Sequence, residues 1–266
     1  MNKFILFIDS GIGGISILKS FLEKQNNSSI LYFADTENFP YGNREQTEIA
    51  EILVDIYRRM SSKYDIGLIT VACNTASVSA LDQIRKVVKI PVVGTVPAIK
   101  KASESTKNNK IGVIATNSTV KQRYIYDLID KFARDKEVFI HPCPELVNAV
   151  ELDYNKQQII ESINKELSFF NDKDIDSLVL GCTHYSFLIK EINEYFIGKV
   201  RIIDSSEGVS NRIISLIDSS FLSYTNEKYC IISSNITNCL SKYERLNNRL
   251  NIFDKILLEE KICLKA

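Results

Sequence analysis

The sequence predicts an α/β fold of two similar lobes, each a mostly parallel sheet flanked by helices. Three observations predict it. Short apolar runs rich in β-branched residues recur along the chain, segments with helical spacing separate them, and the order of the strand ends repeats once within the 266 residues. The hydrophobic content of 45% is enough to build a real core and excludes a disordered chain.

Eight apolar runs are the predicted strands. They lack the alternation of a strand that faces water on one side, so helices should cover both faces of the sheet. The segments between them have helical spacing, as at Ile49, Ile52, Leu53 and Ile56. The predicted strands are Phe4–Ile8, Ile30–Phe33, Ile66–Val71, Pro91–Val93, Ile111–Ala115, Val138–His141, Leu178–Leu180 and Val200–Ile203.

The strand ends repeat after 106 to 110 residues, as Phe7–Gly11 matches Val113–Asn117. So long a period favours two lobes over a solenoid, with chance matching of β–loop–α units as the alternative. We expect residues 1–98 plus about 208–266 to form the first lobe and about 99–207 the second, related by a pseudo-two-fold axis with the active site between them.

The segment beyond about residue 208 lies outside the repeat. It predicts a helix over Glu207–Ile217, a strand over Tyr229–Ile232 and helical segments after it, packed back onto the first lobe. Nothing in this tail suggests chemistry. We interpret its cysteines, and Cys143, as structural; those of the tail are Cys230, Cys239 and Cys263.

Charge and cysteine use exclude several functional classes. Thirty-three basic and 33 acidic side chains give no excess positive charge for a nucleic-acid partner. No run reaches the 18 or so apolar residues of a membrane span, and Phe4–Ile8 is too short for a secretion signal. We therefore expect a cytoplasmic protein with reduced thiols and neither a nucleic-acid nor a membrane partner.

Cys73 and Cys182 stand at the same point of the two repeats, each after a strand and before a polar stretch that can begin a helix. A helix N-terminus should lower a thiol pKa, and its N–H groups can bind a carboxylate. Two thiols facing one cleft could remove a proton from one face of a carbon and return one to the other. The pair therefore predicts racemisation or epimerisation, whereas a single reactive cysteine would suggest acyl transfer.

Three further strand-end residues, Asp9, Glu151 and His184, could tune or relay the thiol protons. The alternative for the two carboxylates is a helix cap or a surface charge. The other histidine, His141, is interpreted as structural. The glycine-rich turn Gly11–Gly14 is a weak dinucleotide signal and fits better as a tight turn near a small anion.

The sequence resembles the glutamate racemase family from Phe7 to about Arg212. Four ordered motifs carry the resemblance, each with the spacing of the family. They are Asp9–Gly14, Phe33–Thr36 with Phe39–Gly42, Ala72–Ser77 and Leu180–Tyr185.

The resemblance implies interconversion of L- and D-glutamate without a cofactor or a metal, supplying D-glutamate for peptidoglycan synthesis, and so cell wall and cell shape. It is compatible with a homodimer, although the sequence does not show the oligomeric state. It implies that Cys73 acts on the D-isomer and Cys182 on the L-isomer, with Asp9, Glu151 and His184 as auxiliary proton-handling groups. The implied substrate-binding residues are Asp9, Ser10, Tyr41, Gly42, Asn74, Thr75, Thr183 and His184.

Several alternatives stay open. Ser77 and His184 separate the chain from aspartate racemases, which usually carry His and Glu there. Ser186, Glu145 and Asn148 depart from the family and leave the local loop shape in doubt. Another racemase or isomerase of the superfamily, acting on aspartate, hydantoins or maleate, is one alternative, and an amino-acid-binding protein without turnover is another. Dependence on pyridoxal phosphate leaves no short signature, and a metal held by Cys143, Cys182 and His184 lacks the usual ligand spacing.

Overall fold

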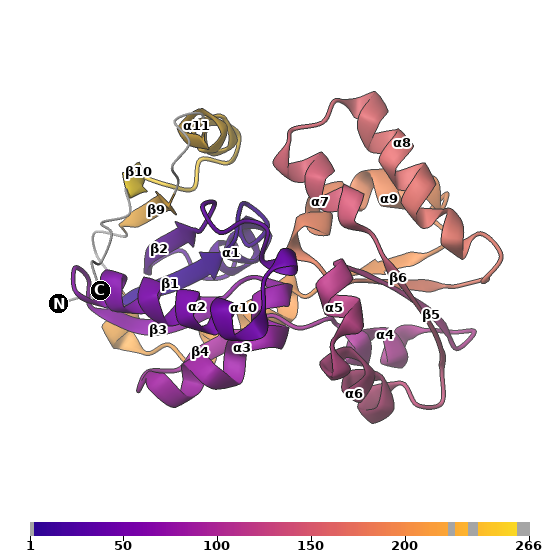
Figure 1. The fold of residues 1–266 in the computed structure, drawn as a ribbon, viewed down its shortest axis with the longest axis horizontal. Coiled ribbons are helices and arrows are strands. Elements are labelled where there is room, and N and C mark those ends of the chain that lie inside the picture. Colours follow the sequence, from indigo (N-terminus) through magenta and orange to yellow (C-terminus); the bar gives the residue numbers. More distant parts are fainter. Residues whose placement is uncertain (1–2, 223–226, 234–238, 260–266) are drawn as a thin grey trace.

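The computed structural model describes residues 3–222, 227–233 and 239–259. Its strands form two parallel sheets, with the orders β10-β9-β2-β1-β3-β4 and β6-β5-β7-β8, which lie beside each other in Figure 1. The eight predicted strands and the predicted two-lobe α/β fold are confirmed. The strands are β1 (Phe4–Asp9), β2 (Ser29–Ala34), β3 (Ile66–Val71), β4 (Val92–Gly94), β5 (Lys110–Ala115), β6 (Glu137–Pro142), β7 (Ser177–Leu180), β8 (Arg201–Ile203), β9 (Lys228–Ser233) and β10 (Lys255–Glu259).

Helices connect the strands. The α-helices are α1 (Ile15–Leu22), α2 (Gln46–Ser61), α3 (Asn74–Val87), α4 (Ile99–Ser105), α5 (Asn117–Lys121), α6 (Arg123–Phe132), α7 (Pro144–Glu151), α8 (Lys156–Leu167), α9 (Ile189–Tyr195), α10 (Ser206–Ile214) and α11 (Cys239–Leu250). The short 3₁₀ helices are η1 (Tyr41–Asn43), η2 (Ser168–Phe170), η3 (Thr183–Leu188) and η4 (Ser219–Phe221). Among the described residues, no helix combines the length and the apolar character that crossing a bilayer requires.

Each sheet is covered on both faces, which explains why its strands are apolar throughout. In β1, Leu6 and Ile8 pack toward α2 and α3, whereas Ile5 and Phe7 pack toward α1 and α10. The second sheet is covered by α7, α8 and α9 on one face and by α4 and α6 on the other. The order β2-β1-β3-β4 recurs as β6-β5-β7-β8, so the repeat in the sequence is also a repeat of topology.

The tail beyond residue 208 extends the first sheet, because β9 pairs with β2 and β10 pairs with β9. The predicted strand and helix of the tail are present, although α10 ends at Ile214 rather than Ile217. The expectation of helical segments alone after β9 is wrong, since Lys255–Glu259 forms an edge strand. This strand lies at the edge of the sheet and, among the described strands, pairs with β9 alone.

Cysteines outside the thiol pair have packing roles where the structure describes them. Cys143 and Cys230 are fully buried, and Cys230 lies in the core beneath α1 and α11. The side chain of Cys239 and the whole of Cys263 lie outside the described part of the chain.

Candidate active site

Equivalent strand ends of the two sheets face each other. Helix α1 of the first sheet contacts η3 of the second, and α3 and η1 contact α5. Cys73 follows β3 and precedes α3, and Cys182 follows β7 and precedes η3. Both thiols are 7% exposed. They are close enough for charge on Cys182 to raise the pKa of Cys73, so the structure brings the two predicted thiols to one site.

The helix N-terminus acts on the Cys73 pKa in the predicted direction, but the predicted net lowering of that pKa is wrong. Burial raises the pKa of this thiol well above its usual range, and the charge of Asp9 adds to the rise. Hydrogen bonds from the backbone N–H groups of Ala76 and Thr75 act in the predicted direction but are outweighed. Desolvation disfavours a thiolate more than one helix end stabilises it, so Cys73 rests as a protonated thiol.

Cys182 is the first member of a buried chain of polar groups. Its Sγ lies 3.6 Å from Nδ1 of His184, and Nε2 of His184 lies 2.7 Å from Oε1 of Glu151. Burial acts to lower the pKa of His184, but its hydrogen bonds to Cys182 and Glu151 prevail and raise that pKa well above the usual value. The chain is therefore a cysteine side chain, an imidazolium and a carboxylate in series.

Glu151 is the last residue of α7 and stays ionised although it is buried. Burial acts to raise its pKa, but the hydrogen bond and charge of His184, together with Lys242, lower the pKa to about 2. The Lys242 ammonium donates to both the side chain and the backbone carbonyl of Glu151. Lys242 lies in the tail, which the sequence interpretation left out of the site, and it contacts a candidate site residue. The sequence carried no signal for this contact, which joins residues 91 positions apart.

Asp9, at the end of β1, is fully buried and joins the two sheets. Its Oδ1 accepts the N–H of Gly11 at 2.8 Å, and its Oδ2 lies 3.3 Å from the Thr183 hydroxyl. Burial raises its pKa to about 6, against the charge of His184 and the Gly11 hydrogen bond. A carboxyl group that titrates near neutral pH and is electrostatically coupled to Cys73 can exchange protons with that side of the site.

The glycine-rich turn brings backbone close to the second sheet. A Cβ at Gly11 would overlap the Glu151 carboxylate, and one at Gly13 would lie 2.5 Å from both the His184 ring and the Thr183 hydroxyl. The intervening Ile12 N–H donates to Glu151 Oε1 at 2.8 Å. The turn was predicted to approach a small anion, and in the structure the anion it meets is the side chain of Glu151.

Beside Cys73, polar side chains of the two sheets meet at the start of α3. Thr75 Oγ1 lies 3.1 Å from Thr116 Oγ1 and 3.3 Å from Thr119 Oγ1. Asn74 is 2% exposed, and within the described part of the chain neither its amide nitrogen nor its oxygen has a hydrogen-bond partner. Such a group costs stability unless a ligand satisfies it. Sequence reasoning missed Thr116 and Thr119, although Thr116 occupies the strand-end position that matches Ser10 in the repeat.

The remaining predicted binding residues lie around this cluster. Tyr41 and Ser10 are buried, and the Tyr41 hydroxyl donates to Asp35 at 2.7 Å. This hydrogen bond holds the Tyr41 hydroxyl on a residue of the first lobe. Gly42 lies against Thr116 of the second sheet, at ordinary contact distance from where a Cβ would stand.

Ser77, Ser186, Glu145 and Asn148, which bear on the family assignment, make hydrogen bonds outside the cluster at the start of α3. Ser77 accepts the N–H of Thr95 and donates to Val71, which ties β3 to the segment after β4. Ser186 donates to Asp204 at 3.0 Å. Glu145 accepts bonds from Tyr154 and Asn148, so the unusual residues of this loop pair with one another.

One cluster of described residues has ligand atoms close enough to hold a metal ion, namely His141, Cys143 and Glu166. Burial raises the pKa of the Cys143 thiol, as does its hydrogen bond to Glu166, so the thiol stays protonated. The His141 ring stacks on Phe169 with centroids 4.5 Å apart. Cys143 therefore groups with His141 and Glu166 and not with the Cys182–His184 pair considered from the sequence.

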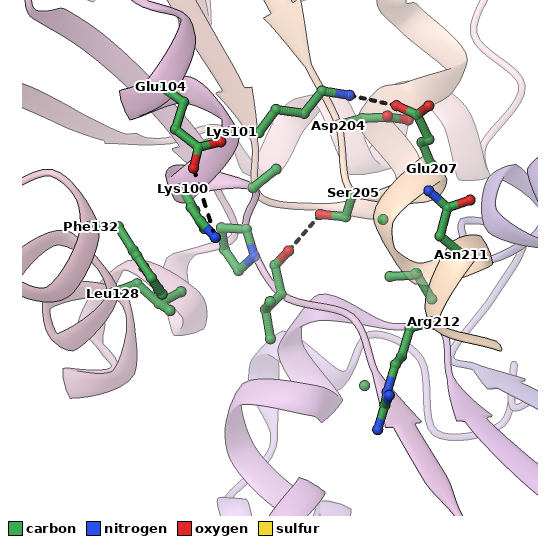
Figure 2. Close-up of a pocket in the computed structure, with 16 residues that line it drawn as sticks. Lys100, Lys101, Glu104, Leu128, Phe132, Asp204, Ser205, Glu207, Asn211 and Arg212 are labelled. Atoms are coloured by element: carbon green, nitrogen blue, oxygen red, sulfur yellow. Dashed lines mark hydrogen bonds and ion pairs between the residues drawn. The ribbon is translucent and has the colours of Figure 1, made fainter. Parts of the chain in front are cut away.

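A cavity of about 650 Å³ lies away from the thiols, where the chain crosses between the sheets after β4 and after β8. Figure 2 shows two ion pairs among its charged side chains, Lys101 with Glu207 and Lys100 with Glu104. The described residues that line this cavity include no cysteine or histidine, so it offers no reactive group to compare with the thiol pair.

Comparison with known proteins was made against families, curated proteins and solved structures. Residues 16–208 match the family model of Asp/Glu/Hydantoin racemase. The chain is 40% identical over 228 residues to the glutamate racemase of Haemophilus influenzae (strain 86-028NP), which covers 85% of this chain and 84% of that protein. It is 39% identical over 219 residues to the glutamate racemase of Sphingopyxis alaskensis, covering 80% and 82% of the two chains.

Solved structures extend the likeness to the whole chain. Glutamate racemase of Escherichia coli, in complex with L-glutamate and the activator UDP-MurNAc-ala, is similar with a TM-score of 0.90 at 27% identity, over 98% of this chain and 99% of that one. The Francisella tularensis enzyme in complex with D-glutamate has a TM-score of 0.79 at 29% identity, over 96% of both chains. An aspartate racemase of Picrophilus torridus shares the fold, with a TM-score of 0.56 at 19% identity over 80% of this chain and 93% of that one.

Proposed function

The chain belongs to the glutamate racemases of the Asp/Glu/Hydantoin racemase family, and on this premise we propose that it interconverts L- and D-glutamate without a cofactor at the site between its two sheets. The observation that carries the proposal is the placement of Cys73 and Cys182 at equivalent strand ends of the two sheets, in one buried cluster. Stereoinversion needs an acid and a base on opposite faces of one carbon, and two matched thiols supply both.

In the L-to-D direction, Cys182 as thiolate takes the α-proton of L-glutamate. The C–H electron pair stays on the α-carbon, and the protonated Cys73 thiol returns a proton to the opposite face. The hydrogen bond from the imidazolium of His184 stabilises negative charge on the Cys182 sulfur. Burial of Cys73 keeps its thiol protonated, which is the form that the acid needs in this direction.

The reaction leaves Cys73 as thiolate and Cys182 as thiol, and the reverse reaction starts from that state. Asp9, with a pKa of about 6, and His184 are the groups placed to restore the starting protonation. Each turnover breaks one C–H bond and forms one, so no redox partner is needed.

Substrate recognition uses the cluster at the start of α3. The unpartnered amide of Asn74 offers a donor to a carboxylate and an acceptor to an ammonium group. The hydroxyls of Thr75, Thr116 and Thr183 add uncharged donors. Since the thiols are only 7% exposed, we expect the two lobes to separate when glutamate enters.

Cellular role and assembly complete the proposal. Family membership supports a source of D-glutamate for peptidoglycan synthesis, and so for cell wall and cell shape, in the cytoplasm. We propose lobes of residues 1–98 plus about 208–266 and of about 99–207, supported by the pairing of β9 with β2 and the packing of α10 on α1. A homodimer is proposed by resemblance, and light scattering of the purified protein tests it.

The direct test is racemisation of glutamate by purified protein without added pyridoxal phosphate or metal, followed by optical rotation. We expect interconversion in both directions, with exchange of the α-hydrogen for deuterium in D₂O. Racemisation that survives Cys73→Ala undiminished would contradict the two-thiol mechanism.

Substrate choice is tested by comparing D-glutamate with D-aspartate. The TM-score of 0.90 to a glutamate racemase, against 0.56 to an aspartate racemase, supports glutamate. A faster rate on D-aspartate would overturn this choice. Calorimetric binding of glutamate with no change in optical rotation over hours would instead indicate a binding protein.

A further inference from the structure

Helix α11 contacts both lobes next to the buried chain of Cys182, His184 and Glu151, which is called the relay below. Its apolar residues Leu240, Tyr243 and Leu246 pack into the core of the first sheet. From the same helix, the Lys242 ammonium reaches Glu151 at the C-terminal end of α7, on the second sheet, and contacts both its carboxylate and its backbone oxygen. Figure 1 shows α11 and α7 on the same side of the molecule.

The Lys242 contact determines how the Glu151 carboxylate is oriented. Lys242 donates to Oε2 of Glu151. The other oxygen, Oε1, accepts from the Ile12 N–H at 2.8 Å and lies 2.7 Å from His184 Nε2. An ammonium at a helix C-terminus is also favoured by the helix dipole. The charged and polar groups that face Glu151 thus come from three segments, namely α11, the turn after β1, and η3.

We propose that Lys242 is a positioning residue of the active site: by holding Glu151 in the orientation that orders His184, it controls proton transfer at Cys182 and leaves the Cys73 side untouched. The inference rests on the proposed racemase function. It concerns the tail of the chain, because α11 begins at Cys239, beyond residue 208 where the match to the family model ends.

A matched control lies one turn further along α11. Arg245 also reaches across to the second sheet, where its guanidinium lies 3.9 Å from Asp153, but this pair is exposed and does not contact Glu151. Lys242→Met and Arg245→Met each remove one bridging cation while they keep an unbranched apolar chain. Only the first should disturb the relay. Lys242→Arg keeps the charge and should restore much of the function.

The kinetic test measures both directions for wild type, Lys242→Met, Lys242→Arg and Arg245→Met. The equilibrium constant of racemisation is near one and no variant changes it, so kcat/KM must fall equally in both directions. For Lys242→Met we expect a fall of about ten-fold, as for loss of a charged hydrogen bond. In Lys242→Met, the kinetic isotope effects measured with the two α-deuterated enantiomers should change in opposite directions. The effect of α-deuterated L-glutamate should rise because Cys182 removes that proton, whereas that of α-deuterated D-glutamate should fall as reprotonation by Cys182 limits the rate.

The outcomes separate the two proposals. Equal isotope effects in the two directions, or an equal loss in Arg245→Met, would reduce Lys242 to a structural role and overturn the inference. Wild type without racemase activity would overturn the proposed function instead. In that case NMR decides the inference, because the chain has only two histidines. The hydrogen-bonded Nε2–H proton of His184 should be seen in wild type and Arg245→Met and lost in Lys242→Met, and its persistence there would refute the positioning role.

Discussion

His184 Nε2 lies 2.7 Å from Glu151 Oε1, and through this contact an imidazole beside one thiol is held by a carboxylate from a different helix. The pair is buried, with side-chain exposures of 4% and 7%. A buried imidazolium and a buried carboxylate are each unfavourable alone, and together they stabilise each other's charge. The pH behaviour of the site follows from this pair and from Asp9.

Replacing Glu151 by Gln should lower both activity and stability. The pKa of Glu151 is lowered from 4.5 to about 2, so its ionisation stabilises the folded state above pH 4.5, and that contribution is lost as the pH falls toward 2. We expect a loss of about 3 kcal/mol at pH 7 in urea unfolding and a fall of roughly 100-fold in kcat/KM. Glu166→Gln is the control, because this buried carboxylate contacts Glu145 N–H and Cys143 instead of the relay. Comparable activity losses in both variants would argue against the relay.

Asp9→Asn should stabilise the protein while it abolishes activity. Folded Asp9 holds its proton up to about pH 6, whereas the unfolded chain releases it near pH 3.8. The folded state therefore binds more protons between these values, and the contribution of Asp9 to stability falls as the pH rises through this window. Asp9→Asn should be more stable by up to about 3 kcal/mol at pH 7, and the difference should shrink toward pH 4. Unfolding curves between pH 4 and 7 measure it, and a difference that is constant with pH would contradict the buried, proton-holding carboxyl.

Gly13→Ala should disrupt the site through a steric clash. The new Cβ would stand 2.5 Å from the His184 ring and from the Thr183 hydroxyl, so both must shift. We expect a loss of about 1–3 kcal/mol in stability and a larger proportional loss in kcat. Gly208→Ala, in α10 with no atom within 4 Å of the added Cβ, should be neutral or more stable by up to about 1 kcal/mol. Full activity in Gly13→Ala would show that the close approach of this turn is dispensable.

Asn74→Leu should separate binding from stability. Both polar atoms of the Asn74 amide are buried without a partner among the described residues, so an apolar group of similar size should leave stability unchanged or raise it by about 1 kcal/mol. KM for glutamate should rise, because the substrate loses its donor and acceptor. Ser79→Ala, which removes another buried unpartnered hydroxyl from α3, should raise stability without changing KM. An unchanged KM in Asn74→Leu would remove this residue from substrate recognition.

Much of the fold could be read from local sequence. Most of the predicted strands are buried on both faces, which leaves an unbroken apolar run that is visible without an alignment, whereas β6 and β8, at the edges of the second sheet, are only partly buried. The internal repeat then placed Cys73 and Cys182 at equivalent points, since matching topology brings matching strand ends to matching positions. Edge strand β10 was missed, and its pairing with β9 is a tertiary contact that the local sequence does not show.

The site beyond the thiols could be predicted only by residue type. Asp9, Glu151 and His184 were identified as proton-handling candidates, but their order of contact was not, and the hydroxyls of Thr116 and Thr119 were overlooked. Their partners lie 41 and 44 residues away, at Thr75. Contacts of this kind have no spacing rule, because they arise where two sheets are brought together.

The sequence by itself determined the α/β class, the doubled topology and the two thiols, because strand burial and strand-end chemistry are local properties. Only the tertiary structure decided that burial keeps Cys73 protonated against the pull of its helix end, and that Lys242 reaches Glu151. The physical reason is the same for both. A pKa and a long-range ion pair depend on which groups surround a residue and how much water remains, and these are set when the two sheets and the tail pack together.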